Sequence, residues 1–436
     1  MSERKKVVVT GLGLVTSLGI DVEGSWQKAL AGVPGIHRLT YPLSEKSPVQ
    51  AVGEVSPLDW KKITEEFEEE AETEGERKTL FALWAAKRAL EDAGLTDHSG
   101  PRSRYGVVFA SGLGINRLED VQKWVAADKK FDVVKFGKEH SQVHRESIVR
   151  NNSNRTAALV ASKFGFSGAN CTITCACASG TQAAGIGFRT VQKGEADVMI
   201  VGGADSMINP VGLVFFVLLS AASTSLDPPE TLCRPFDRKR SGLVMGEGAG
   251  VAILEEENHA LRRGAKIYGE VVGYGASLDA HQVTAPHPQG RGAEQSMRAA
   301  LRDAGLASDQ IDYINAHGTS TKLNDVIETM AIKKVFGEHA SRIAVSSTKS
   351  LIGHLLAASG APEFVFTVLT VARNEIHPTL NLTHPDPKCD LDYVPNVKRG
   401  RTVRAALSNS FGFGGQNGSI IVKKYGQPHH GKRDDT

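Results

Sequence analysis

Short runs of apolar and β-branched residues alternate with longer helical runs along nearly the whole chain. Strands are expected, for example, at residues 6–10, 105–110 and 198–203, and helices at residues 79–93 and 179–193. Alternation of this kind is typical of a sheet that is covered by helices. We therefore expect an α/β fold built on a mainly parallel sheet.

A second series of strands and helices starts near residue 265 and follows a similar order. Its expected strands cover residues 267–273, 311–316, 343–347, 405–409 and 419–424. This similarity divides the chain into an N-terminal half, residues 1–264, and a C-terminal half, residues 265–425, although the halves share no visible sequence repeat. Residues 426–436 are polar and are expected to form a disordered tail.

The charge and hydropathy of the chain argue against several classes of partner. The formal net charge is +2, so no overall basic field would attract nucleic acid or a membrane surface. The longest apolar stretch, residues 211–222, is shorter than the roughly 20 residues that a membrane-spanning helix needs. Residues 1–6 are polar and charged, which is not the pattern of a secretory signal.

The cysteines indicate a reducing compartment. The chain has five of them, and an odd number in a large chain without a signal fits the cytoplasm better than a disulfide scaffold. Cys171, Cys175 and Cys177 cluster in sequence, but they lack the Cys-x-x-Cys spacing of a metal site and no histidine lies nearby. We expect no metal centre.

Gly11 and Gly13 follow the first expected strand, as the glycines of a nucleotide-binding turn do. Thr16 stands where a dinucleotide-binding motif has its third glycine, and no acidic residue ends a second strand about twenty residues further on. We therefore expect the two glycines to form a tight turn against a neighbouring helix.

The segment Thr174-Cys175-Ala176-Cys177-Ala178-Ser179-Gly180 joins an expected strand to an expected helix. Unpaired N–H groups and the positive end of the helix dipole favour the thiolate there, so we expect a lowered pKa for a cysteine in this turn. The small neighbours of Cys177 leave room for a bulky thioester, and Gly180 would let the helix start close to the strand. A buried, inert thiol is the alternative.

Two histidines each follow an expected strand in a turn rich in glycine, serine and threonine. His317 follows the strand at residues 311–316, and His354 follows the strand at residues 343–347. Open α/β sheets bind ligands at the carboxyl ends of parallel strands. The two histidines are therefore candidates for the site of Cys177.

Three further residues have both a functional and a structural interpretation. Lys349 has small, uncharged neighbours, which favours burial beside a partner such as Glu328. Glu328 would alternatively close a capping box that starts at Asp325. The glycine-rich run at residues 409–415 predicts a β-hairpin, and it also offers a backbone N–H to an oxyanion, with Phe413 able to gate the cysteine.

Together, five separated motifs resemble the condensing enzymes of the thiolase superfamily, most closely the type II β-ketoacyl-[acyl-carrier-protein] synthases. The motifs are residues 176–180, 315–321, 347–355 and 409–415, and residues 234–237 leading into 246–250. The resemblance covers Val7 to Lys424. It implies a duplicated five-layered α/β/α/β/α fold, a homodimer or a heterodimer, and chain elongation by decarboxylative Claisen condensation.

The resemblance also implies the roles of individual residues. Cys177 would carry the acyl chain as a thioester, and His317 and His354 would stabilise the enolate formed from malonyl-carrier protein. The backbone N–H groups of Cys177 and Phe413 would form an oxyanion hole. Further roles are implied for a supporting pair, Lys349 and Glu328, for the contacts to the pantetheine arm, Thr319 and Thr321, and for the lining of the acyl pocket, Leu113 and Phe216.

By the same resemblance, no metal or organic cofactor is required. Loss of the malonyl carboxylate drives carbanion formation, and the 4′-phosphopantetheine arrives on acyl carrier protein, the expected partner. Four positions depart from the pattern of the family: Cys175, Ser241, Leu243 and Gln416. These departures leave open the acyl specificity and whether the pathway makes fatty acids or a specialised polyketide or polyene.

Three other activities are weighed against elongation. A non-catalytic partner of the chain-length-factor type would lack the nucleophile, whereas Cys177 is present. A thiolase would carry a second cysteine in the region of Gly412 to Gly415, which has none. An enzyme that starts chains from acyl-CoA usually pairs cysteine with one histidine and one asparagine, whereas this chain offers His317 and His354.

Overall fold

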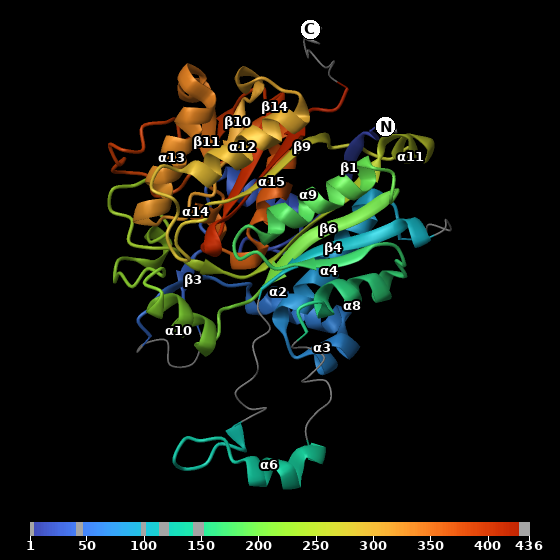
Figure 1. The fold of residues 1–436 in the computed structure, drawn as a ribbon, viewed down its shortest axis with the longest axis vertical. Helices are drawn as coiled ribbons and strands as arrows, with labels where there is room; N and C mark the ends of the chain where they lie inside the picture. The colour runs from blue at the N-terminus through green and yellow to red at the C-terminus, as the bar shows by residue number, and fades with distance from the viewer. Residues whose placement is uncertain (1–3, 41–46, 97–101, 113–121, 143–151, 427–436) are drawn as a thin grey trace.

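The computed structural model describes residues 4–40, 47–96, 102–112, 122–142 and 152–426. Ten strands form one hydrogen-bonded sheet in these ranges, in the order β11-β10-β14-β15-β9-β1-β8-β6-β4-β5 (Figure 1). The strands are β1 (Val7–Val15), β4 (Tyr105–Ser111), β5 (Asn170–Ile173), β6 (Val198–Asp205), β8 (Gly248–Glu256), β9 (Gly269–Leu278), β10 (Tyr313–Asn315), β11 (Ala344–Ser346), β14 (Ala405–Phe411) and β15 (Gln416–Lys423).

The sheet is mixed, and the expectation of a mainly parallel sheet is wrong. Parallel pairing is limited to β4 with β5 and β6, and β10 with β11 and β14. The other neighbours run antiparallel, because β8 and β15 return along the strands that open the two halves of the sheet. A pattern of alternating strands and helices does not reveal such returning strands.

Helices cover both faces of the sheet and also lie between its two halves. One outer layer contains α4 (Arg77–Ala93) and α8 (Arg155–Phe164), and the other contains α12 (Arg291–Ala304) and α13 (Lys322–Phe336). Between them, α9 (Ser179–Gln192) contacts β4, β6 and β15, and α15 (Gly360–Arg373) contacts β8 and β14 (Figure 1). The five layers are therefore α/β/α/β/α, as expected.

The two central helices approach each other closely at their first turns. A Cβ atom at Gly180 would lie 2.6 Å from the backbone nitrogen of Ala361, so a larger residue would push α9 and α15 apart. The Thr181 and Ser410 hydroxyl groups, 2.8 Å apart, connect α9 with β14. The sequence had indicated that Gly180 lets a helix pack closely on a strand. In the structure, Gly180 instead permits the close packing of two helices.

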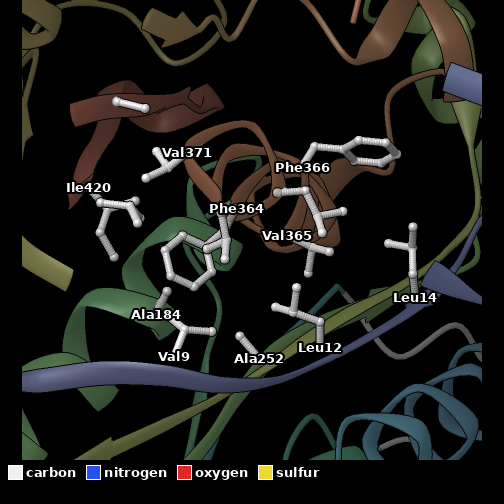
Figure 2. Close-up of a cluster of buried hydrophobic side chains, with 14 of the residues drawn as sticks. Val9, Leu12, Leu14, Ala184, Ala252, Phe364, Val365, Phe366, Val371 and Ile420 are labelled. Carbon is white, nitrogen blue, oxygen red and sulfur yellow. The ribbon is translucent and has the colours of Figure 1, made fainter. Parts of the chain in front are cut away.

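The largest cluster of buried side chains lies between the central strands and α15. Figure 2 shows Val9, Leu12 and Leu14 of β1 facing Phe364 and Val365 of α15. All five side chains are buried. This packing fixes α15, and with it the turns at its N-terminal end, against the sheet.

Gly11 and Gly13 lie inside β1, so no turn forms there. Added Cβ atoms at these positions would overlap the backbone of α4 at Ala89 and Ala85. The predicted contact with a neighbouring helix is therefore confirmed, while the predicted turn is wrong.

The remaining elements lie around this framework. The helices are α1 (Val22–Leu30), α2 (Pro57–Glu66), α3 (Glu68–Glu74), α6 (Val133–Glu139), α10 (Pro210–Leu218), α11 (Glu257–Arg262) and α14 (Lys349–Ile352). A three-stranded sheet contains β2 (His37–Arg38), β3 (Ala51–Gly53) and β7 (Met245–Gly246), and a two-stranded sheet contains β12 (Glu375–Ile376) and β13 (Arg399–Gly400). Within the described ranges, no helix is both long and apolar enough to cross a membrane.

Candidate active site

Cys177 lies in a strained turn between β5 and α9. Ala176 has a φ of 47°, which is in the left-handed region that residues with a Cβ seldom adopt. The Ser179 hydroxyl holds this turn, because it accepts a hydrogen bond from the Cys175 N–H (2.7 Å) and donates one to the Ala176 carbonyl (2.6 Å). These two bonds fix the backbone on both sides of Cys177.

The surroundings of Cys177 raise the pKa of its thiol, whereas the sequence had predicted that they would lower it. The side chain is only 6% exposed, and this burial raises the pKa of Cys177 to about 11. The positive charge of Lys349 and a hydrogen bond from the Phe413 N–H act in the opposite direction without cancelling the effect of burial. The expectation of a lowered pKa is therefore wrong, since desolvation of the buried thiol outweighs the groups that favour the thiolate.

The glycine-rich turn between β14 and β15 comes within contact distance of this cysteine. The two strands pair antiparallel, so the predicted hairpin is confirmed. A Cβ atom at Gly412 would lie 3.0 Å from the backbone nitrogen of Cys177. A larger residue at Gly412 would crowd this contact, and the close approach brings the Phe413 N–H to the Cys177 sulfur.

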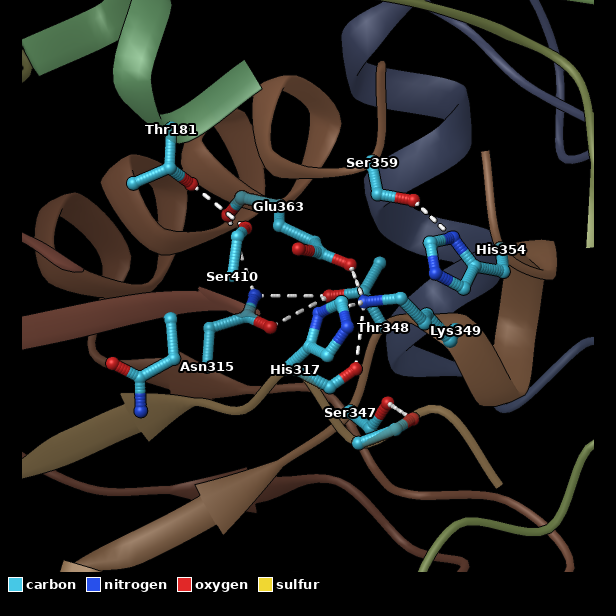
Figure 3. A network of polar contacts seen from close by, with 12 residues as sticks. Thr181, Asn315, His317, Ser347, Thr348, Lys349, His354, Ser359, Glu363 and Ser410 are labelled. Atoms are coloured by element: carbon cyan, nitrogen blue, oxygen red, sulfur yellow. Dashed lines mark hydrogen bonds and ion pairs between the residues drawn. The ribbon is translucent and has the colours of Figure 1, made fainter. Parts of the chain in front are cut away.

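His317 follows β10 and is held by its backbone. The N–H groups of His317 and Gly318 donate hydrogen bonds of 2.9 and 2.8 Å to the two carboxylate oxygens of Glu328. The Lys349 Nζ donates to the His317 carbonyl at 2.6 Å and lies 3.3 Å from His317 Nδ1 (Figure 3). An ammonium group has no acceptor, so Nδ1 must be the acceptor and the neutral ring carries its proton on Nε2.

His354 follows α14 and takes the same tautomer through different partners. Its Nδ1 accepts a hydrogen bond from the Leu356 N–H at 3.0 Å and lies 2.7 Å from the Ser359 hydroxyl (Figure 3). With Nδ1 acting as an acceptor, Nε2 is the donor. The two imidazole rings are nearly perpendicular, with their centres 5.4 Å apart.

Both histidines are neutral donors at physiological pH. Each is about 2% exposed, and burial lowers the pKa of His317 and of His354 well below the ordinary value for histidine. The nearby charge of Lys349 lowers both pKa values further. The arrangement therefore supplies two uncharged N–H donors rather than two cations.

The ion-pair partner of Lys349 is Glu363, not Glu328. Lys349 and Glu363 are both buried and form a direct ion pair between α14 and α15 (Figure 3). Burial raises the pKa of Glu363, and the charge of Lys349 opposes that rise. Sequence reasoning missed Glu363, although a lone carboxylate in the otherwise apolar run of α15 was an available signal, because buried carboxylates are rare unless paired.

Glu328 is buried in the middle of α13 and does not close a capping box. The N-cap of α13 is Thr321, whose hydroxyl accepts from the Asn324 N–H. Burial raises the pKa of Glu328 to about 7. The hydrogen bonds that Glu328 accepts from two backbone N–H groups lower this pKa, but by less than burial raises it. Its observed contacts fix the backbone at His317 and Gly318 rather than the Lys349 side chain.

A cavity of about 400 Å³ brings most of the predicted residues together. Cys177, His317, His354, Phe413 and the pair Thr319 and Thr321 all line it. The two threonine hydroxyl groups are 2.9 Å apart. One thiol, two neutral imidazoles and a backbone N–H therefore face a single space.

The two residues predicted for the acyl pocket have different outcomes. Phe216, on α10, packs with Phe413 against a buried apolar cluster that includes Leu213 and Leu243. Phe216 itself is not part of the cavity lining. Leu113 lies outside the described residues. The role of Phe216 in the acyl pocket therefore stays a prediction.

The chain is similar to known proteins over nearly its whole length. Residues 4–260 match the family Beta-ketoacyl synthase, N-terminal domain, and residues 268–383 match Beta-ketoacyl synthase, C-terminal domain. The chain is 44% identical over 424 residues to a 3-oxoacyl-[acyl-carrier-protein] synthase 2 of Synechocystis sp.. The match covers 97% of this chain and 99% of the Synechocystis protein.

Solved structures show the same fold. A chain of AntDE:AntF, a type II polyketide synthase acyl-carrier protein in complex with its ketosynthase, matches with a TM-score of 0.86 and 32% identity over 97% of this chain and 100% of that one. The ishigamide ketosynthase/chain length factor matches with a TM-score of 0.83 and 31% identity, again over 97% and 100%. The similarity includes the regions that carry Cys177, His317 and His354.

Proposed function

The protein belongs to the β-ketoacyl synthase family. From that premise, we propose how the residues that line the cavity around Cys177 join two acyl groups. The protein is a 3-oxoacyl-[acyl-carrier-protein] synthase of type 2, an acyltransferase that forms a carbon–carbon bond in fatty acid synthesis. One observation supports the proposed site above the others. A single cavity holds a thiol and two imidazoles, and each imidazole has its Nδ1 occupied by a donor.

In the first step, Cys177 takes the acyl chain from acyl-carrier protein. Its sulfur bonds to the thioester carbonyl carbon, the bond to the pantetheine sulfur breaks, and the proton of the thiol passes to the departing sulfur. The raised pKa of Cys177 keeps the resting thiol protonated, so this proton is available for transfer. Deprotonation is therefore confined to the moment of attack.

In the second step, malonyl-carrier protein loses its carboxylate. The bond to the carboxylate carbon breaks, carbon dioxide leaves, and the electron pair forms an enolate whose negative charge develops on the thioester oxygen. The Nε2–H groups of His317 and His354 donate to this oxygen. Neutral donors that are already oriented stabilise such charge without reorganisation, which is the largest catalytic contribution expected here.

In the third step, the enolate carbon attacks the carbonyl carbon of the acyl-Cys177 thioester. The oxygen becomes an oxyanion, which accepts hydrogen bonds from the N–H groups of Cys177 and Phe413. When the intermediate collapses, the bond to the Cys177 sulfur breaks and the thiolate takes up a proton from the solvent. The product is a β-ketoacyl chain two carbons longer on the second carrier protein.

The other predicted residues support these steps. Lys349, paired with Glu363, fixes the tautomer of His317, and Glu328 fixes its backbone. Thr319 and Thr321 hydrogen-bond the pantetheine arm near the opening. Phe216 limits the acyl pocket.

The assembly and the location are also part of the proposal. Acyl carrier protein is the partner that brings both substrates, and the chain works as a dimer, most simply with a second copy of itself. In support, β5 lies at the end of the sheet and pairs only with β4 within the described ranges, so an edge is available to a second chain. The five cysteines are free, which fits a cytoplasmic enzyme.

A second candidate is a ketosynthase subunit for a specialised polyketide or polyene. It is favoured by the likeness to the ketosynthases of AntDE:AntF and of the ishigamide system. The two candidates share every step above and differ in the acyl chains accepted and in the need for a different partner subunit. Product length therefore distinguishes them.

The test is the intact mass of the carrier protein after incubation with enzyme, octanoyl-carrier protein and malonyl-carrier protein. A β-ketoacyl product two carbons longer, absent with Cys177→Ala, is expected. No product together with acylated Cys177 would favour the specialised candidate, because another extender or subunit would be missing. No product and no acylation would contradict the proposed role of Cys177.

A further inference from the structure

Asp205 is a buried carboxylate that the steps above do not use. It ends β6, is only 2% exposed, and does not line the cavity. Its two oxygens accept hydrogen bonds from backbone N–H groups, Oδ1 from Ser206 at 2.9 Å and Oδ2 from Ala357 at 3.0 Å. Ala357 belongs to the short turn that follows His354. Because burial of a carboxylate is costly without such bonds, Asp205 and this turn stabilise each other.

Two glycines leave room for the contact between Asp205 and the turn. A Cβ atom at Gly112, just after β4, would lie 2.5 Å from Asp205 Oδ2. A Cβ atom at Gly203, on β6, would lie 3.2 Å from the Cα atom of Ala358 in the turn. Residues 356–358 therefore pack directly against the ends of these two strands.

The carboxyl group of Asp205 is ionised at neutral pH. Burial raises the pKa of Asp205 to about 6, while the charge of Lys78 and the hydrogen bond from Ala357 oppose that rise. A hydrogen bond to an ionised acceptor is roughly twice as strong as one between neutral groups. The bond from the Ala357 N–H is of this stronger kind.

The residue between His354 and Ala357 that this bond restrains is Leu356, whose backbone is strained. Its φ is 50°, in the left-handed region that residues with a Cβ seldom adopt and that persists only where the surroundings hold it. The Leu356 N–H donates to His354 Nδ1 at 3.0 Å, and the N–H of the next residue donates to Asp205. The peptide groups on both sides of the Leu356 Cα atom are thus held. Without Asp205, Leu356 could relax and turn its N–H away from the imidazole.

The Leu356 N–H selects the tautomer of His354, and the other contact of Nδ1 does not. The Ser359 hydroxyl lies 2.7 Å from Nδ1, but a hydroxyl can either donate or accept and therefore fits both tautomers (Figure 3). A backbone N–H only donates, so it fits only the ring that carries its proton on Nε2. Whatever keeps the Leu356 N–H in place therefore keeps this proton on Nε2.

From this geometry, and resting on the proposed function, we infer that Asp205 is a positioning residue for His354. It fixes the Ala357 N–H, which keeps the Leu356 N–H on His354 Nδ1 and leaves Nε2–H as the donor to the enolate oxygen. The proposed acylation of Cys177 uses no donor from His354. Asp205 therefore serves the malonyl half-reaction and not the acylation.

The experiment compares Asp205→Ala and Asp205→Asn with wild type. Alanine removes both acceptors, whereas asparagine keeps the shape and replaces one acceptor oxygen by a nitrogen that cannot accept. Asp312→Asn is the matched control. Asp312 is 5% exposed and accepts the Arg404 N–H at 2.8 Å, and it precedes β10, whereas His317 follows that strand.

Three quantities are measured for each protein. They are the release of carbon dioxide from malonyl-carrier protein, the acylation of Cys177 by octanoyl-carrier protein, and the ¹⁵N NMR spectrum of protein labelled at histidine. The signal of His354 is identified by its loss in His354→Ala. The spectrum reports which ring nitrogen carries the proton, and a purely structural role of Asp205 would leave that unchanged.

Release of carbon dioxide should fall about tenfold in Asp205→Ala and less in Asp205→Asn, below the roughly 10²–10³-fold loss expected when a whole donor is removed. Acylation should not fall, because the charge of Asp205 raises the pKa of Cys177 and its removal favours the thiolate. The His354 proton should lie on Nε2 alone in wild type and on both nitrogens in the Asp205 variants. Asp312→Asn should match wild type in all three measurements.

Two results would overturn the inference. A His354 proton that stays on Nε2 in the folded Asp205 variants would show that the Leu356 N–H does not depend on Asp205. Equal losses of carbon dioxide release and of acylation would show general damage to the site. If Asp205→Ala does not fold, Asp205→Asn decides in the same way. The tautomer is measured without substrate, so a wild type inactive in both half-reactions would contradict the proposed function, and the NMR result would still decide whether Asp205 positions His354.

Discussion

At the scale of the residue, Cys177 combines features that work in opposite directions. Burial raises its pKa, while the Phe413 N–H and the charge of Lys349 favour its thiolate. In the proposed mechanism, the N–H that contacts the resting sulfur later donates to the oxyanion of the acyl intermediate. A protonated resting thiol also protects the enzyme from oxidation and alkylation, because the thiolate is the reactive form.

We predict that iodoacetamide alkylates Cys177 slowly at neutral pH. Because the thiol is protonated below its pKa of about 11, the rate constant should rise about tenfold per pH unit from pH 7 to pH 10. The measurement is the mass of the Cys177 peptide against time, with Cys177→Ala as the blank. A plateau reached near pH 8 would contradict the account of burial.

We predict that His354→Ala separates the two half-reactions. Loss of one oriented donor should slow release of carbon dioxide from malonyl-carrier protein by about 10²–10³-fold. Acylation of Cys177 should remain close to wild type, because the proposed mechanism uses His354 only to stabilise the enolate. His384→Ala is the control, since its side chain is 45% exposed. Equal loss of both half-reactions would assign His354 to acylation as well.

At the scale of the element, short strands followed by turns could be predicted well. Cys177 follows β5 and His317 follows β10, whereas the short helix α14 lies between β11 and His354, and the structure brings all three residues to one cavity. The partner of Lys349 could not be predicted in the same way. Glu363 lies on α15, and only the packing of α14 against that central helix decides which carboxylate Lys349 meets.

The Lys349–Glu363 ion pair should stabilise the junction of α14 and α15. Lys349→Met leaves a buried carboxylate without a partner, which should lower the free energy of unfolding by about 3–5 kcal/mol. Burial already raises the pKa of Glu363, and removing Lys349 raises it further. The folded state then holds a proton that the unfolded state releases, so this loss should grow as the pH rises above the ordinary glutamate range.

Urea denaturation at two pH values measures this effect. The double variant Lys349→Met/Glu363→Gln should recover most of the stability, because no uncompensated charge remains. Its stability should also depend less on pH than that of the single variant. Equal losses in the single and the double variant would show that packing, not charge, holds the junction.

At the scale of the whole molecule, the division into residues 1–264 and 265–425 remains a proposal about duplication. The first three residues of β1 pair with β9, and α9 and α15 contact strands of both halves. Neither half would bury the central helices without the other. The order of elements in the sequence suggested two similar halves, but the shared helix layer depends on close packing at Gly180, which only the three-dimensional structure reveals.

This shared layer predicts cooperative unfolding. Calorimetry of the full chain should show one transition, because loss of either half exposes the core between β1 and α15. The Gly180→Ala variant should shift that single transition to lower temperature, since its Cβ would meet the backbone of α15. Two resolved transitions would show that the halves are independent folding units.

The central claim is that an acyl group passes from Cys177 to a second carrier protein with formation of a carbon–carbon bond. The most direct measurement is a chase of enzyme first loaded with isotope-labelled octanoyl groups, isolated, and then mixed with malonyl-carrier protein alone. We predict that the label leaves the Cys177 peptide and appears on the carrier protein as a β-ketoacyl chain two carbons longer, at the same rate. Label that stays on Cys177, or leaves as free octanoic acid while the carrier protein gains no mass, would contradict the account.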